Sequence, residues 1–303
     1  MPWLQLFVNT DNQQAPVIED TLLNAGALSV TFKEHIPQGE NEKPILEPGL
    51  NETPLWDNTR VVGLFDSTIN NESVNWLLDQ LFDGNLTYRW EQLEDKDWER
   101  EWMQNYRPIQ CSDNLWICPS WVTPPNPEAI NVLMDPGLAF GTGTHPTTFL
   151  CMQWLAQQSL DNSNIIDYGC GSGILGVTAL LLGAKQATGI DIDPQALLAT
   201  HDNLARNRLT TERFTVHLPE QCPKIQADIV IANILAGPLV ELADTLIELL
   251  APGGKLCLSG ILQEQADTIM SAYSHAIDFD AFTQSGEGSG EKDGWIRLSG
   301  NKL

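Results

Sequence analysis

The sequence predicts two domains: a small α+β domain, followed by a larger α/β domain built on a doubly wound parallel sheet. The 303 residues exceed the usual length of one domain. Strand-like and helix-like segments follow a βαββαβ order at first, and alternate regularly after about Ile109. A glycine-rich turn, "DYGCGSGILG" at 167–176, joins one of the later strands to the next helix.

Residues 1–93 form the smaller predicted domain. Alternating or β-branched segments predict four strands, at 3–9, 28–34, 61–66 and 86–93. Apolar residues at helical spacing predict two helices, at 16–27 and 72–82. A polar segment with several prolines, 36–59, is expected to be a loop. The βαββαβ order is that of ferredoxin-like domains.

Residues 94–108 are expected to form a connecting helix. Trp98, Trp102 and Tyr106 recur every four residues in an otherwise charged segment. This spacing places the aromatic rings on one side of a helix, packed against a domain, and leaves the other sides in solvent.

Residues 109–303 predict a Rossmann-like domain. Its expected strands are 115–121, 130–135, 164–168, 187–192, 214–218, 227–234, 255–261 and two late strands, the second ending in "GWIRLSG" at 294–300. Its expected helices are 147–158, 173–183, 194–207, 238–250 and 264–273. In such a fold the ligand crevice lies at the carboxyl ends of the strands.

Charge and cysteine usage exclude several classes of protein. The formal charge of −24, from 16 basic and 40 acidic residues, disfavours a nucleic-acid partner and favours a basic protein. No apolar run reaches the ~18 residues of a membrane span, and the N-terminus lacks the pattern of a secretory signal. The six cysteines have neither paired nor zinc-binding spacing, so we expect free thiols, no metal and a cytoplasmic location.

Two overlapping glycine patterns raise the question of the cofactor. G-x-G-x-x-G begins at Gly171, with Asp191 20 residues further on, as in dinucleotide-binding domains. G-x-G-x-G begins at Gly169, two residues after Asp167 at the predicted strand end. A pyrophosphate beside Asp167 would meet a carboxylate with no cation nearby.

S-adenosylmethionine fits the acidic loop better, because it has no phosphate and carries an ammonium and a sulfonium. Gly169 and Gly171 would let the backbone approach it closely. Asp191 would accept hydrogen bonds from both ribose hydroxyls. Asp193 stands before Pro194 and is expected to cap the next helix instead.

Two further polar residues are candidates for this site. Thr148 lies in the predicted first turn of a helix that begins at Pro146, where free N–H groups attract a carboxylate. A role limited to helix capping remains open for it, and His145 is expected to be structural. Asn233 ends the strand 227–234 and would orient the cofactor or an incoming nucleophile, although it could also merely close the turn.

The motifs "DPGLAFGTGTHPTT", "DYGCGSGILG", "GIDIDP" and "ANILAGPL" closely resemble the ribosomal protein L-eleven methyltransferase family (PrmA) over nearly the whole chain. The resemblance implies transfer of methyl groups from S-adenosylmethionine to lysine side chains and the N-terminal amine of that basic ribosomal protein. It further implies recognition of the protein by the N-terminal domain, and cofactor contacts at Thr148, Gly169, Asp191 and Asn233. No residue is a convincing general base.

Other functions remain as alternatives. The nearest is an S-adenosylmethionine-dependent RNA or DNA N-methyltransferase, disfavoured by charge and by Ile234 in a place where such enzymes often carry an Asn-Pro-Pro-aromatic motif. A nicotinamide-dependent oxidoreductase would also use the glycine pattern. An RNA-binding module is disfavoured by acidity, since residues 1–107 hold 7 basic and 19 acidic side chains.

Overall fold

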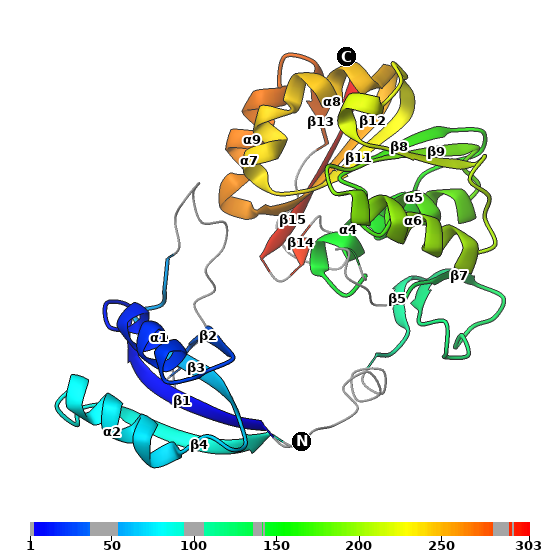
Figure 1. The fold of residues 1–303 in the computed structure, drawn as a ribbon. Coiled ribbons are helices and arrows are strands. Elements are labelled where there is room, and N and C mark those ends of the chain that lie inside the picture. Colours follow the sequence, from blue (N-terminus) through cyan, green and yellow to red (C-terminus); the bar gives the residue numbers. More distant parts are fainter. Residues whose placement is uncertain are drawn as a thin grey trace. The chain divides into compact units, whose positions relative to one another are not determined.

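The computed structural model describes residues 3–36, 54–93, 106–135, 141, 143–280, 291–292 and 294–303. The chain divides into two compact units, Met1–Met103 and Gln104–Leu303, and each is described by itself (Figure 1). Most of the predicted connecting helix falls on residues 94–105, outside the described residues, and 106–108 have no regular secondary structure. Among the described residues, no helix is long and apolar enough to cross a membrane.

The N-terminal unit has the predicted βαββαβ order. Its elements are β1 (Trp3–Asp11), α1 (Ala15–Asn24), β2 (Ser29–Glu34), β3 (Asn58–Asp66), α2 (Asn71–Leu81) and β4 (Thr87–Leu93). The strands form an antiparallel sheet in the order β2-β3-β1-β4, which confirms the ferredoxin-like prediction.

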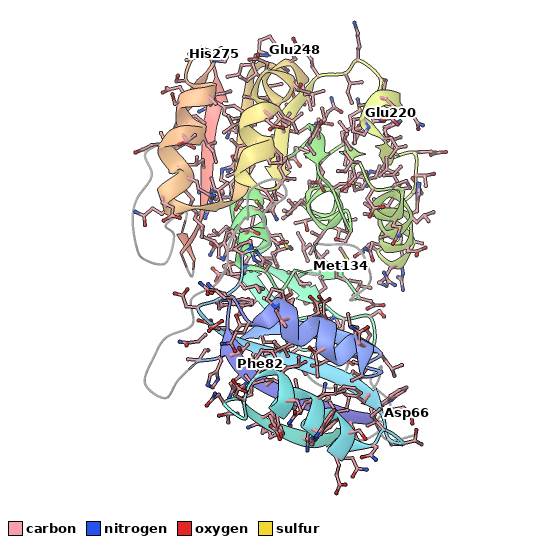
Figure 2. All side chains as sticks on the ribbon, turned by 60° about the vertical axis from the view of Figure 1, so that its left-hand side comes forward. Asp66, Phe82, Met134, Glu220, Glu248 and His275 are labelled. Atoms are coloured by element: carbon pink, nitrogen blue, oxygen red, sulfur yellow. The ribbon has the colours of Figure 1, made fainter. Side chains whose placement is uncertain are left out.

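One face of this sheet makes the core of the unit. The strands alternate, so that Leu6 and Val8 of β1 point to the same side as Val61 of β3. The helices supply apolar residues four apart, such as Ile18 and Leu22 of α1. Both helices lie on the same side of the sheet, as Figure 2 shows. The sheet is therefore covered by helices on one face.

The C-terminal unit is built on a larger, mainly parallel sheet. Its strands are β8 (Asn164–Tyr168), β9 (Gln186–Ile190), β10 (Phe214–His217), β11 (Ala227–Asn233), β12 (Leu250–Leu262), β13 (Ile277–Phe279), β14 (Glu291–Lys292) and β15 (Trp295–Lys302). They follow the order β10-β9-β8-β11-β12-β15-β13, with β14 paired to β15. Strand β15 is antiparallel to both β12 and β13.

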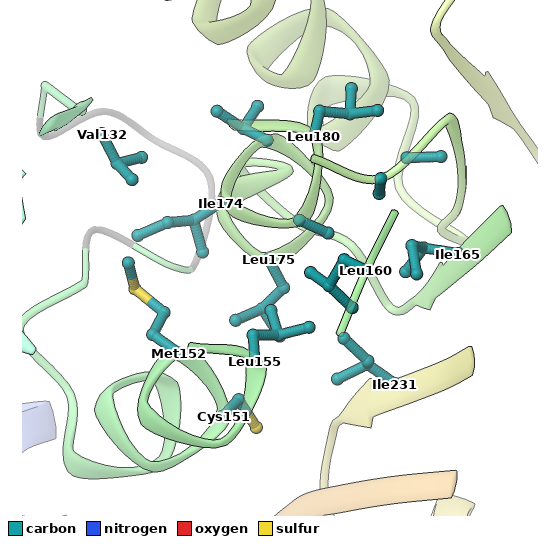
Figure 3. Close-up of a cluster of buried hydrophobic side chains, with 14 of the residues drawn as sticks. Val132, Cys151, Met152, Leu155, Leu160, Ile165, Ile174, Leu175, Leu180 and Ile231 are labelled. Atoms are coloured by element: carbon teal, nitrogen blue, oxygen red, sulfur yellow. The ribbon is translucent and has the colours of Figure 1, made fainter. Parts of the chain in front are cut away.

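Helices cover both faces of this sheet. They are α4 (Pro146–Leu155), α5 (Ile174–Leu181), α6 (Pro194–Arg206), α7 (Ala236–Glu241), α8 (Ala243–Leu249) and α9 (Ala266–Tyr273), with short 3-10 turns at Pro219–Gln221 and Gln263–Gln265. Ile165 of β8 joins the cluster under α4 and α5 (Figure 3), whereas Ile166 joins the cluster under α7, α8 and α9. Strands buried on both faces are apolar throughout, which accounts for "IVIA" in β11.

The sequence-based assignments differ from the structure in one helix and two strands. The predicted helix 238–250 is two helices, α7 and α8, separated at Leu242. No glycine or proline stands at the break, so the helical spacing continues through it. A small third sheet joins β5 (Ile109–Ser112), β6 (Leu115–Cys118) and β7 (Ile130–Leu133). Strand β5, like the two-residue β14, was not predicted.

Candidate functional site

The candidate site lies where the strand order of the large sheet reverses. From β8 the chain proceeds through β9 and β10 to one side, whereas β11, the other neighbour of β8, leads to β12 on the opposite side. Such a switch point opens a crevice at the carboxyl ends of the strands. Gly169 follows β8, Asp191 follows β9 and Asn233 ends β11. The fold thus brings three of the predicted site residues to one edge.

The glycine turn after β8 needs glycine for its backbone conformation. Gly169, Gly171 and Gly173 have φ angles of 71°, 53° and 75°, a region that L side chains rarely adopt. A Cβ added to Gly169 would also lie 2.2 Å from Cγ2 of Ile234. The turn is therefore a tightly packed platform at the start of α5, and not a loose loop.

Asp191 supports this turn and keeps acceptor capacity. Its Oδ2 accepts a hydrogen bond from the N–H of Gly171 at 2.8 Å, and its Oδ1 accepts from the N–H of Asp193 at 3.0 Å. Each carboxylate oxygen retains a further lone pair. Asp193 caps α6 through the N–H of Gln195, as the sequence predicted. The two neighbouring acids therefore have different tasks.

Thr148 and Asn233 meet across the site although 85 residues separate them. Nδ2 of Asn233 donates to Oγ1 of Thr148 at 3.3 Å, and the Thr148 side chain is fully buried. Among the described residues, Oδ1 of Asn233 is buried without a hydrogen-bond partner. A buried amide oxygen left unpaired costs ~1–3 kcal/mol, so this atom is suited to accept from a ligand's N–H or O–H group.

The first turn of α4 is capped by a residue that the sequence suggested to be structural. Nδ1 of His145 accepts from the N–H of Thr147 at 3.3 Å and lies 2.7 Å from its hydroxyl oxygen. Burial lowers the pKa of His145, which favours the neutral ring that can accept. Its ring packs edge-on against Trp295 of β15, with centroids 4.9 Å apart. Sequence reasoning missed Trp295, since nothing local links it to His145.

The sequence suggested that the Asp167 carboxyl group stands beside the cofactor at the end of its strand, but the structure buries it. The carboxyl group is buried under the glycine turn, and Oδ2 accepts from the N–H of Gly176 in the first turn of α5 at 2.9 Å. Burial raises its pKa to about 7. The carboxyl thus joins β8 to α5 and carries less charge near neutral pH than an exposed aspartate. This weakens the electrostatic argument from Asp167, while Asp191 still supports it.

Helix α6 holds the glycine turn through residues that the sequence did not reveal. The Thr200 hydroxyl donates to the carbonyl of Gly171 at 3.1 Å, and Asn203 Nδ2 donates to the carbonyl of Ser172 at 2.8 Å. The Ser172 hydroxyl in turn donates to the carbonyl of Gly141 at 2.6 Å. Thr200 and Asn203 are buried polar residues three positions apart on a helix that mixes polar and apolar residues. The pattern alone would suggest solvent exposure for them.

The described residues contain no group of three or more His, Cys, Asp or Glu side chains that could hold a metal ion. The six cysteines are free thiols, five of them buried. The donor set at the strand ends consists of backbone N–H groups, a carboxylate, an amide and a hydroxyl. Such a set suits an organic ligand with amino and hydroxyl groups better than a metal.

Comparison with known proteins decides the family. The profile described as "Ribosomal protein L11 methyltransferase (PrmA)" matches residues 2–302. The chain belongs to this family. A ribosomal protein L11 methyltransferase of Cellvibrio japonicus is 55% identical over 303 residues, covering 100% of this chain and 99% of the relative. One from Saccharophagus degradans is 54% identical, with 100% of both chains covered.

A solved structure agrees with this assignment. The crystal structure of ribosomal protein L11 methylase from Lactobacillus delbrueckii has a TM-score of 0.56 and 30% identity, and covers 65% of this chain and 99% of that one. The predicted Rossmann-like fold is confirmed, and S-adenosylmethionine is the methyl donor of this PrmA-family chain. Asp191, Gly169, Gly171, Thr148 and Asn233 stay predicted cofactor contacts.

Proposed function

We propose that this PrmA-family chain transfers methyl groups from S-adenosylmethionine to lysine side chains and the N-terminal amine of ribosomal protein L11, in the cytoplasm. The observation that carries the proposal is the pairing of Asn233 with Thr148 at the sheet switch point, where Oδ1 of Asn233 has no hydrogen-bond partner within the described parts of the chain. This oxygen could accept a hydrogen bond from the amino group of the cofactor or from an incoming amine, since both carry N–H groups.

The residues present fit the methyl donor. Asp191 would accept from the ribose hydroxyls, with its carboxylate already held by the N–H groups of Gly171 and Asp193. The first turn of α4, at Thr148, would face the methionine carboxylate. The turn at Gly169 and Gly171 would let the ligand approach the backbone closely. Bound there, S-adenosylmethionine supplies a methyl group activated by its sulfonium.

The chain's own contribution to the reaction is positioning and the exclusion of water. The donor would supply its sulfonium methyl group to a neutral amine nitrogen, and S-adenosylhomocysteine would leave with the electron pair of the carbon–sulfur bond. The new ammonium loses its proton to solvent. Asn233 would orient the amine or the donor, and the rate should rise with pH as lysine, with a reference pKa of about 10.4, deprotonates.

The division of labour follows the two units. Residues 1–93 would recognise the substrate, 94–108 would connect, and 109–303 would carry the transfer. Residues 1–107 carry a formal net charge of −12, half of the chain's −24. This negative charge suits a basic protein substrate and disfavours direct nucleic-acid contact.

Intact-mass spectrometry tests the proposal. Ribosomal proteins and ribosomal RNA from a strain lacking this enzyme would be incubated with the purified chain and labelled S-adenosylmethionine. We expect label in one ribosomal protein, on lysines and its N-terminus, and none in RNA. Label in RNA alone would support the competing RNA N-methyltransferase, and Asn233→Ala should strongly reduce the labelling of the protein.

A further inference from the structure

The described basic residues of the N-terminal unit lie on one face of its sheet. Its described part contains three basic residues, Lys33 of β2, Arg60 of β3 and Arg89 of β4. Their chain neighbours Phe32, Val61 and Tyr88, and Trp90 beside Arg89, belong to the core or pack against it. Because side chains alternate along strands, all three cations lie on the face opposite the helices. The charged residues of the helices are all acidic: Glu19, Asp20, Glu72 and Asp79.

Two of the cations lie in one cross-strand row, and the third lies beside it. Lys33 is directly opposite Arg60, which is opposite Asn9, which is opposite Thr87. Arg89 lies beside this row, opposite Phe7. Like charges directly opposite each other destabilise a sheet, so the Lys33–Arg60 pair carries a cost that an anion bound there would offset.

The guanidinium of Arg60 is fixed without being neutralised. Its Nε donates to Oδ1 of Asn9 at 2.8 Å, and its NH2 group donates to Nδ1 of His35 at 2.6 Å. Burial and the charge of Arg60 lower the pKa of His35, which keeps the ring neutral. In the described parts of the chain, neither Arg60 nor Lys33 forms an ion pair with a carboxylate. Arg60 therefore keeps its full charge and its NH1 donors.

Arg89 supplies a second guanidinium at the same place. It lies over the Phe7 ring, 5.1 Å from the centroid, and its Nε is 2.9 Å from Glu91 Oε1. A pocket of about 120 Å³ is lined by Phe7, Asn9, Arg60, Thr87, Tyr88 and Arg89. Since a liquid water occupies roughly 30 Å³, this space holds a carboxylate and a short aliphatic stem. Guanidinium groups are the side chains best shaped for that anion.

We propose that this sheet-face pocket binds a carboxylate side chain from an acidic segment of the ribosomal protein substrate. The inference rests on the proposed function and adds a recognition site to it. Arg60 and Arg89 make a locally cationic pocket on a sheet face that also carries Asp11, Asp66 and Glu91, and the helices on the other face are acidic. A local positive site of this kind helps to fix the orientation of a partner. The acidity of the whole unit repels the long phosphate backbone of a nucleic acid, so a short acidic segment is favoured.

Methylation kinetics with the full chain and purified ribosomal protein L11 test this site. Arg89→Glu and Arg60→Gln should each raise KM for the protein about tenfold or more, as for a lost charge-assisted hydrogen bond. The kcat value and the dissociation constant for S-adenosylmethionine should stay unchanged. The matched control is Lys224→Glu, an exposed lysine that precedes β11 in the other unit, which should leave KM unchanged. Arg89→Lys keeps the charge and should recover most of the affinity.

A charge-reversal rescue identifies the ligand. Each aspartate and glutamate of L11 would be changed to lysine in turn, and one of these substrates should restore a near wild-type KM with the Arg89→Glu enzyme. An unchanged KM in both arginine variants, or no rescue by any substrate, would overturn the proposal. So would single-stranded oligouridylate binding to the wild type at physiological salt that both variants lose while KM stays constant. Absence of methylation by the wild type would instead refute the proposed function.

Discussion

The two units use a β-sheet in opposite ways. In the N-terminal unit helices cover one face, and the strands alternate between the apolar core and a face that carries Lys33, Arg60 and Arg89. In the C-terminal unit helices cover both faces, so the central strand β11 is mainly apolar, and the polar residues Asp191 and Asn233 stand at strand ends. A sheet with one open face offers a surface for recognition, whereas a sheet buried on both faces offers a crevice at its edge for chemistry.

Removing the N-terminal unit is the strongest test of that contrast. The N-terminal core and the two C-terminal clusters draw on different units, so a chain starting near Glu94 should fold and bind S-adenosylmethionine. Its kcat/KM for the ribosomal protein should fall on the order of 100-fold or more, because the binding energy that positions the lysine is lost. Calorimetric titration and intact-mass kinetics check both parts, and full methylation by this truncated chain would contradict the assigned roles.

The next largest effect is expected at the strand-end carboxylate. Asp191→Ala should weaken S-adenosylmethionine binding by at least about tenfold, since charge-assisted hydrogen bonds are worth ~1.5–3 kcal/mol each. Loss of its bond to the Gly171 N–H adds to the effect. Asp193→Ala is the matched control: it removes the cap of α6 and about 1 kcal/mol of stability, but should leave affinity nearly unchanged. Equal affinities of the wild type and Asp191→Ala in calorimetry would remove Asp191 from the site.

Two glycine substitutions compare a packed turn with an open helix position. Gly169→Ala combines a positive φ with a Cβ 2.2 Å from Ile234, and should destabilise the C-terminal unit by ~1–3 kcal/mol. Gly237→Ala in α7 meets nothing within 4 Å and should be neutral or stabilise by ~0.5–1 kcal/mol. Denaturant unfolding measures both, and the expectation fails if the two variants have the same midpoint.

A pH-dependent effect is expected at the buried carboxyl of Asp167. Its pKa of about 7 in the folded state exceeds the reference value of 3.8, so the folded state holds this proton more tightly than the unfolded state. The stabilisation is present below about pH 4 and is lost as pH rises toward 7, by at most about 1.4 kcal/mol per pH unit. Asp167→Asn should remove this part of the pH dependence in urea unfolding at pH 5, 6 and 7. Parallel curves for the two proteins would show that Asp167 is ionised throughout.

Local patterns in the sequence predicted most of the fold. The alternation of Leu6 and Val8, the helical spacing of Ile18 and Leu22, and the Asp193 cap each depend on residues within a few positions of one another. Such patterns can be recognised in the sequence alone, because the periodicity of a strand or helix determines which residues face the core. Where a feature has no local signal, as at the Leu242 break or in four-residue β5, the prediction missed it.

For the site, the sequence by itself determined which residue types stand at the strand ends, because glycine turns and acidic strand ends have a recognisable order. Tertiary structure alone decided which of them meet. Thr148 meets Asn233, Thr200 holds Gly171, and Asp167 turns inward to α5, all through contacts between segments distant in the chain or between neighbouring elements. The grouping of the cations on one face of the N-terminal sheet is likewise a product of strand pairing, since Lys33 and Arg60 become neighbours only when β2 and β3 align.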